Sequence, residues 1–99
     1  MLNIIKNASG KELSFILEGR LDTTTAPELD EAVKNNVEGV EYLKFDLEKL
    51  EYISSAGLRV LLSAQKIMNK QGQMEVVNTA PAVMEIFEVT GFSDILTLR

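Results

Sequence analysis

The chain of 99 residues contains no cysteine, no histidine and no tryptophan, and these absences exclude several kinds of chemistry. Without cysteine there is no disulfide, no thiolate metal site and no cysteine nucleophile. Without histidine there is no imidazole general base, so a Ser-His-Asp triad and a histidine-ligated zinc ion are excluded as well. We therefore do not expect an enzyme, and a chain without cysteine fits the cytoplasm, where we expect the protein to act.

Positive charge is also scarce. Ten Lys and Arg residues stand against 15 Asp and Glu residues, which gives a formal net charge of −5. Phosphate contacts dominate affinity for nucleic acid, so direct binding to DNA or RNA is not expected. No apolar run approaches the roughly 18–20 residues that span a bilayer, and charged residues are scattered through positions 1–20, unlike a signal peptide. We expect a single domain over residues 1–99 and no membrane partner.

The spacing of apolar residues, glycines and prolines predicts alternating strands and helices. Residues 12–19 alternate between apolar and polar side chains, as a half-buried strand does. The sequence Thr25-Ala26-Pro27-Glu28 has the form of a capping box, and helical spacing follows it. We predict strands at 2–7, 12–19, 42–47, 74–77 and 95–98, and helices that begin near 25, 54 and 79 and end at Gly39, Gly72 and Gly91. Gly72 is expected to take the left-handed conformation that ends many helices.

The order of these elements, β-β-α-β-α-β-α-β, predicts an α/β domain with a mixed sheet of about five strands and three or more helices. If the strands that end at 19, 47 and 77 run parallel, the loops after them meet at one edge of the sheet, where ligands bind in open α/β sheets. These loops are rich in hydroxyl and amide groups: Thr23, Thr24, Thr25, Ser54, Ser55, Asn78 and Thr79. We expect the functional site at this edge, with residues 48–55 forming its second loop.

Two serines at the predicted start of the second helix have two compatible explanations. Serine is a preferred N-cap residue, because its hydroxyl accepts a hydrogen bond from a free backbone N–H. A phosphorylated serine there would carry about −1.5 to −2 charges at a helix end that favours an anion. Ala56 and Gly57 would leave the hydroxyl accessible to another protein. Arg59 lies one turn later, as a solvated surface residue or as the partner of a phosphate or carboxylate.

Other kinds of site are not supported by the sequence. Asp22 and Asp46 both stand where a strand ends, but a lone carboxylate is a weak metal signal, so we predict no metal or cofactor site. A serine hydrolase is not expected, because a G-x-S-x-G elbow and a histidine are both missing. No phosphate-binding glycine loop occurs either.

Taken in order, the segments resemble a STAS domain of the bacterial anti-sigma factor antagonist family over residues 2–98. The resemblance is carried by residues 18–22 before the threonine run, by Phe45-Asp46-Leu47, by residues 50–58, and by residues 83–91 with Phe92 after them. It implies an interaction module that, when unphosphorylated, binds an anti-sigma factor with serine kinase activity and so frees a sigma factor. It also implies that the kinase phosphorylates one serine at the start of the second helix, which breaks the complex, and that a PP2C-type phosphatase restores it. Such partner switching regulates transcription indirectly.

This sequence departs from the family's usual D-S-[ST]-G motif at two positions. With Gly57 aligned, Ser55 falls on the phosphorylated serine, Ser54 on the Asp and Ala56 on the second hydroxyl residue. The resemblance thus favours Ser55 as the phosphorylated residue, with Ser54 as a competing acceptor. The partner-binding surface that it implies consists of Asp22, Thr23, Thr24, Ser54, Ser55, Ala56, Gly57 and Arg59.

Two alternatives stand beside this interpretation. STAS folds also serve as subunits of lipid-transport complexes and stress-signalling particles, which involve no sigma factor. A small-ligand carrier or an enzyme is the alternative from a different functional class.

Overall fold

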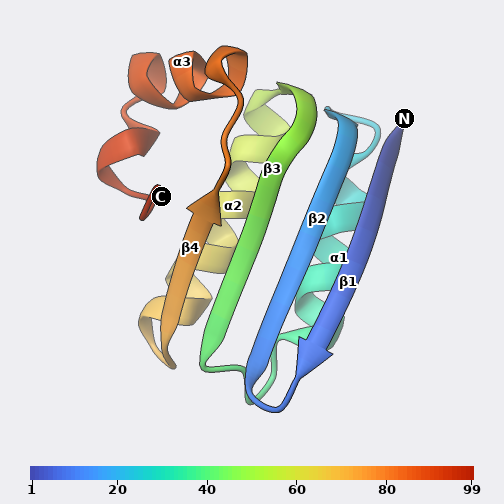
Figure 1. The fold of residues 1–99 in the computed structure, drawn as a ribbon, viewed down its shortest axis with the longest axis vertical. Coiled ribbons are helices and arrows are strands. Elements are labelled where there is room, and N and C mark those ends of the chain that lie inside the picture. Colours follow the sequence, from blue (N-terminus) through green and yellow to red (C-terminus); the bar gives the residue numbers. More distant parts are fainter.

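The computed structural model describes residues 1–99 and consists of a four-stranded sheet with two long helices on one face (Figure 1). The elements are β1 (Leu2–Ser9), β2 (Glu12–Leu21), α1 (Ala26–Asn36), β3 (Tyr42–Ile53), α2 (Ser55–Asn69), β4 (Gln73–Val77), α3 (Pro81–Thr90) and a 3-10 helix, η1 (Phe92–Asp94). The strands lie in the order β1-β2-β3-β4, with β1 antiparallel to β2 and the other pairs parallel. The predicted α/β fold with a mixed sheet is confirmed. No helix is long and apolar enough to cross a membrane.

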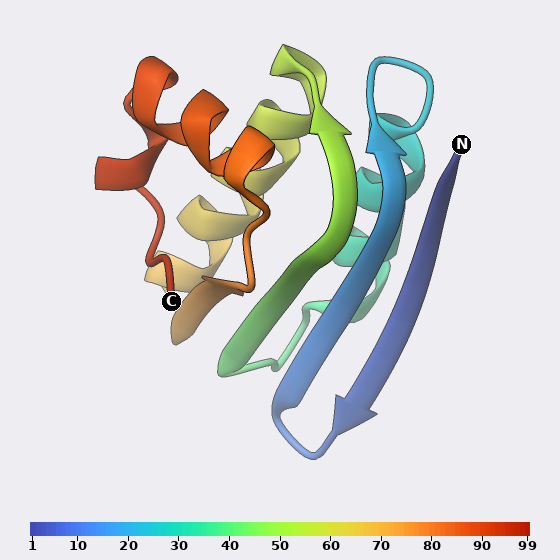
Figure 2. The same ribbon diagram turned by 45° about the horizontal axis from the view of Figure 1, so that its top comes forward.

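The core lies between the sheet and the helices α1 and α2. Alternate residues of β2 (Leu13, Phe15 and Leu17) are buried on that face, as the period-two pattern predicts. Phe15 stacks on Phe45 of β3, with ring centroids 5.7 Å apart. The opposite face of the sheet stays largely uncovered, and α3 lies beside the carboxyl end of β3 (Figure 2).

Strand β3 is longer than the sequence predicts. We expected it to end at Leu47, but it continues to Ile53, so the expected loop of residues 48–55 is mostly strand. Two irregularities in the pairing of β3 with β2 add residues to β3, one beyond Asp46 and one beyond Leu50. Such bulges bend a strand and break its alternation. Buried residues accordingly recur at every second position up to Leu47 and at every third position after it.

The extension of β3 separates the third predicted loop from the other two. Leu21 of β2 pairs with Ile53 of β3, whereas β4 ends where Val77 pairs with Asp46. Ile53 lies well beyond Asp46, because the stretch between them runs alongside five residues of β2, from Ile16 to Leu21, or about 17 Å of strand. Asn78 and Thr79 therefore do not join the other two loops, and the expectation that all three converge is wrong. Asn78 instead donates a hydrogen bond to Asp46, at 3.3 Å.

The last predicted strand, at 95–98, is reduced to a single parallel bridge between Leu98 and Val76. Gly91 ends α3 as predicted and is its C-cap residue, with a φ angle of 83°. Gly39 does not end α1, because the helix stops at Asn36 with Val37 as its C-cap, and Gly39 lies in the turn beyond, with a φ angle of 79°. Gly72 does not have a positive φ. A Cβ atom at Gly72 would instead fall on the carbonyl oxygen of Glu41, so this position requires glycine because two backbone segments approach closely.

Candidate functional site

The turns after β2 and β3 lie side by side at one end of the molecule (Figure 2). The backbone N–H of Ser54 donates to the carbonyl oxygen of Leu21 at 2.9 Å, which ties the two strand ends together. The threonine loop that follows Leu21 thus lies beside the two serines that begin α2. Four of the eight residues predicted to bind a partner lie in these two turns, and the other four lie in the first turns of α2: Asp22, Thr23, Thr24 and Ser54, then Ser55, Ala56, Gly57 and Arg59.

Asp22 organises the threonine loop from within. Its Oδ1 accepts hydrogen bonds from the backbone N–H of Thr24 (3.0 Å), the hydroxyl of Thr24 (2.7 Å) and the backbone N–H of Thr25 (3.1 Å). These donors stabilise the charged carboxylate, chief among them the Thr24 hydroxyl, and lower the pKa of Asp22 from 3.8 to about 2. Asp22 therefore shapes the loop that we expect a partner to contact.

The predicted capping box at Thr25 does not form. Thr25 is the N-cap residue of α1, but its side chain makes no capping hydrogen bond. The hydroxyl donates to the carbonyl oxygen of Arg20 at 2.9 Å and accepts from the N–H of Asp22 at 2.8 Å. Thr25 is buried and fastens the loop to the end of β2, which takes its hydroxyl away from the helix.

We expect the hydrogen bonds that Thr24 and Thr25 donate to the Asp22 carboxylate to be lost in acid. A carboxyl whose pKa is lowered by folding stabilises the native state above its ordinary pKa of 3.8, and that contribution is lost as the pH falls through about 2. Amide chemical shifts of Thr24 and Thr25, followed by NMR from about pH 5 downward, should titrate with a midpoint near 2. The Asp22→Asn variant should lack this transition, and a wild-type midpoint near 3.8 would contradict the assignment.

The two serines at the start of α2 occupy different environments. Ser54 is the N-cap residue, with an extended backbone (φ −98°, ψ 175°), and its Oγ accepts a hydrogen bond from the N–H of Gly57 at 3.4 Å. Ser55 is the first residue of the helix; its side chain is exposed and makes no hydrogen bond within the protein. The hydroxyl of Ser54 is therefore engaged by the helix end, whereas that of Ser55 is available.

Gly57 allows α2 to approach the ends of both strands. A Cβ atom at this position would lie 2.7 Å from Cγ of Leu21 and 2.9 Å from Cγ1 of Ile53, closer than such atoms pack. Because Gly57 is buried against these residues, the first turn of α2 is fixed relative to the threonine loop. The position predicted as a contact residue thus has a clear packing role.

Arg59 lies on the wall of a groove between α1 and α2. The groove has a volume of about 370 Å³ and is lined by Thr23, Ala26, Pro27, Asp30, Lys34, Ala56, Arg59, Val60 and Ser63. Lys34 is paired with Asp30 at 3.0 Å, whereas exposed Arg59 forms no ion pair. The sequence analysis missed the contribution of α1 to this groove, because helical spacing alone does not say which faces of two helices meet.

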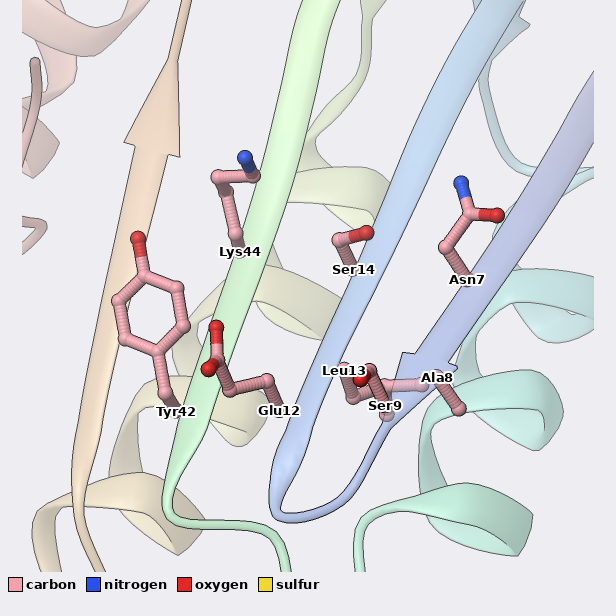
Figure 3. Close-up of a pocket in the computed structure, with 8 residues that line it drawn as sticks. All are labelled: Asn7, Ala8, Ser9, Glu12, Leu13, Ser14, Tyr42 and Lys44. Atoms are coloured by element: carbon pink, nitrogen blue, oxygen red, sulfur yellow. The ribbon is translucent and has the colours of Figure 1, made fainter.

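A second hollow lies at the other end of the open sheet face, near the β1–β2 turn (Figure 3). It has a volume of about 310 Å³ and is lined by Asn7, Ala8, Ser9, Glu12, Leu13, Ser14, Tyr42 and Lys44. No hydrogen bond or ion pair joins these side chains to one another, and Tyr42 is engaged by Glu75 outside the hollow. This hollow therefore lacks the convergent polar groups typical of a ligand site.

No group of three or more acidic side chains is placed to hold a metal ion.

Comparison with known proteins gives consistent matches over the whole chain. The STAS domain model matches residues 3–99. An anti-sigma-B factor antagonist from Listeria monocytogenes is 30% identical over 98 residues, which cover 96% of this chain and 85% of that protein. BtrV of Bordetella bronchiseptica, a proposed anti-sigma factor antagonist, is 38% identical over 81 residues, which cover 80% of this chain and 70% of BtrV.

Solved structures give the same fold. An anti-sigma factor antagonist from Mycobacterium paratuberculosis superposes with a TM-score of 0.89 at 24% identity, covering 99% of this chain and 85% of that one. The Bacillus cell fate determinant SpoIIAA in its phosphorylated form superposes with a TM-score of 0.78 at 15% identity, covering 98% of this chain and 91% of that one.

Proposed function

This chain belongs to the STAS domain family, and we propose that it is an anti-sigma factor antagonist controlled by phosphorylation of Ser55. In this proposal residues 1–99 act as one domain in the cytoplasm. The unphosphorylated protein binds an anti-sigma factor that is also a serine kinase, and the bound kinase releases its sigma factor. Phosphorylation of Ser55 ends the complex, and a PP2C-type phosphatase renews it. Its relatives named as anti-sigma factor antagonists support this function.

The free hydroxyl of Ser55 is the observation that carries the proposal. It is exposed at the first position of α2, whereas the hydroxyl of Ser54 accepts a hydrogen bond from Gly57. The first turn of α2 contains no acidic residue that would repel a phosphoryl group. The free N–H groups of a helix N-terminus also favour an anion. SpoIIAA, whose fold this chain shares, has been solved in a phosphorylated form.

The chemistry is supplied by the partner proteins. In the forward step the Oγ of Ser55 attacks the γ-phosphorus of ATP, the bond to the β-phosphate oxygen breaks, and ADP leaves. The proton of the hydroxyl passes to a base of the kinase, since the Ser55 side chain makes no hydrogen bond to a base within this chain. In the reverse step the phosphatase transfers the phosphoryl group to water and restores the hydroxyl. The antagonist needs only to present Ser55 on a rigid edge.

The proposed contact surface is the edge formed by the threonine loop and the start of α2. Asp22 is the acidic residue in the threonine loop, and its carboxylate accepts hydrogen bonds from the loop itself. Thr23 and Thr24 present exposed side chains, and Arg59 offers a cation without an ion-pair partner. We expect a carboxylate of the partner to pair with Arg59 in the groove between α1 and α2.

Incubation with the anti-sigma factor kinase encoded nearest to this gene, and ATP, should add a single phosphoryl group, measured by intact mass. The Ser55→Ala variant should gain none. Ser54→Asp is the matched control, because aspartate also caps helices but offers no hydroxyl, and this variant should be phosphorylated like the wild type. If no candidate kinase modifies the wild type and Ser55→Asp still binds the partner, the switch is wrong. The chain would then be an unswitched STAS subunit.

A further inference from the structure

The segment that precedes the last residue, Arg99, carries negative charge only. Residues 71–98 contain no Lys or Arg but four acidic residues, Glu75, Glu85, Glu88 and Asp94. Arg99 pairs with Glu75 at 2.5 Å, which leaves the acidic residues of α3 and η1 without an ion pair. This segment therefore has a charge character that the rest of the molecule does not share.

Helix α3 has two apolar stripes but buries only one of them. Val83 and Phe87 are buried in the core. Ala82, Ile86 and Val89, spaced at i, i+4 and i+7, form a second stripe along another side of the helix, in which Ile86 is half-buried against the core and Ala82 and Val89 are exposed. The side chain of Val89 is among the few large apolar ones at the surface, with an exposed fraction of 80%. These residues, with Glu85 and Thr90, line a hollow of about 340 Å³.

A larger hollow adjoins this one at Ala82. It has a volume of about 640 Å³ and is lined by Glu18, Gly19, Glu48, Lys49, Leu50, Glu51, Ala80 and Ala82. Lys49 pairs with Glu18 at 3.7 Å, so Glu48 and Glu51 add negative charge that no cation offsets. Figure 2 shows α3 standing beside the curved carboxyl end of β3, which carries these glutamates. We refer to Ala82, Ile86 and Val89, together with Glu48, Glu51 and Glu85, as the acidic α3 surface.

We propose that the acidic α3 surface binds an amphipathic, Lys- and Arg-rich helix of a partner protein. An apolar stripe at i, i+4 and i+7 matches the apolar face of such a helix, which also recurs every three to four residues. The glutamates beside the stripe attract the cationic flanks of that helix and fix its orientation. None of these residues belongs to the edge around Ser55, so the inference goes beyond the antagonist switch and does not depend on it.

The charge of the surface argues against other occupants. A second copy of this chain would bring the same glutamates against each other, and each chain already has a net charge of −5. Anionic lipid headgroups would be repelled in the same way, since membrane surfaces attract basic segments. A cationic protein helix is the occupant that satisfies both the apolar stripe and the acidic flank.

The test uses a synthetic helical peptide of about four turns, with Leu along one face and Lys on the other, titrated into the isotope-labelled full chain. We expect NMR shift changes centred on Ala82, Ile86 and Val89. A control peptide of the same composition, with its Leu residues distributed around the helix, should bind at least tenfold more weakly. Val89→Lys should weaken binding of the amphipathic peptide at least tenfold. Asn35→Lys, which adds the same charge at an exposed position of α1, should leave it nearly unchanged.

Four results would overturn the proposal. Equal binding of both peptides, or equal effects of the two lysine variants, would mean that only diffuse charge attraction operates. Shift changes that leave α3 unaffected would place the peptide elsewhere. Sedimentation that reveals a dimer of the free chain, dissociated by Val89→Lys, would make a second copy the occupant. Because Val89 is exposed, its replacement should not prevent folding, and an unchanged circular dichroism spectrum verifies this.

Discussion

Phosphoserine incorporated at position 55 during synthesis should weaken binding to the anti-sigma factor at least a hundredfold, measured by isothermal titration calorimetry. The modification places about two negative charges, strongly hydrated, on an edge that otherwise presents hydroxyl groups. Removing that hydration in the complex costs several kcal/mol, and the nearby cation, Arg59, is already paired with a carboxylate of the partner in the proposed complex. A hundredfold loss corresponds to only about 2.8 kcal/mol, so the expected effect is a lower bound. No change of fold is required.

A matched control separates the position of the charge from its amount. Phosphoserine at Ser9 adds the same charge at the end of β1, beside the turn into β2 and at the opposite end of the sheet (Figure 1). Binding of this form should stay within about threefold of the unmodified protein, because exposed charges separated by more than a Debye length of about 8 Å are largely screened. Equal losses from both modifications would indicate a general effect of net charge and would contradict a contact edge at Ser55.

Replacement of Gly72 by alanine should lower the free energy of unfolding by about 3 kcal/mol, measured by urea denaturation. The added Cβ would fall on the backbone of Glu41, and neither segment can move easily. The N–H of Gln73 donates to the Glu41 carbonyl oxygen at 2.9 Å, immediately before β3 and β4 begin to pair. To relieve the clash, the backbone segments at Gly72 and Glu41 would have to move apart, which would disrupt the start of the pairing between β3 and β4.

Asparagine distinguishes this explanation from the one that the sequence suggested. Asn readily takes the left-handed conformation, so it would be tolerated if Gly72 ended the helix in that conformation. In the structure the obstacle is space, and Gly72→Asn should destabilise at least as strongly as Gly72→Ala. Gly10 provides the opposite case, since its φ is 60° and a Cβ there meets nothing within 4 Å. Gly10→Asn should therefore be nearly neutral, and tolerance of Gly72→Asn would contradict the close approach.

The regular parts of the fold could be predicted because each carries a clean period. Alternation in β2 and helical spacing in α2 both report which side chains face the core. The extension of β3 could not be predicted in this way. Its two bulges shift the buried positions to every third residue, so Glu48, Lys49 and Glu51 look like a polar loop when the chain is read alone. For the same reason the sequence wrongly predicts that Asn78 lies beside the serines. That prediction assumes that β3 and β4 end at the same height in the sheet, whereas β3 extends well beyond β4.

The candidate site was predicted better than the contacts that build it. The expectation that parallel strands end at one edge of the sheet placed the threonine loop beside the serines, and the structure agrees on this neighbourhood. The cap of α1 and the packing around Arg59 were predicted less well. Thr25 was expected to cap α1 but holds the end of β2 instead, since a hydroxyl can bond either way and spacing does not decide between the partners. The groove beside Arg59 depends on how two helices pack, which a local pattern does not encode.

The strand order β1-β2-β3-β4 also has a consequence for the way the protein is made. Ribosomes release the chain from its amino terminus at about 5–20 residues per second. Because the order in the sheet repeats the order of synthesis, every strand emerges next to the strand made immediately before it. The bridge from Leu98 to Val76 follows the same rule at the end of the chain. An open edge strand can pair with another chain and start aggregation. In this fold the exposed edge of each new strand is covered by the strand that is synthesised next.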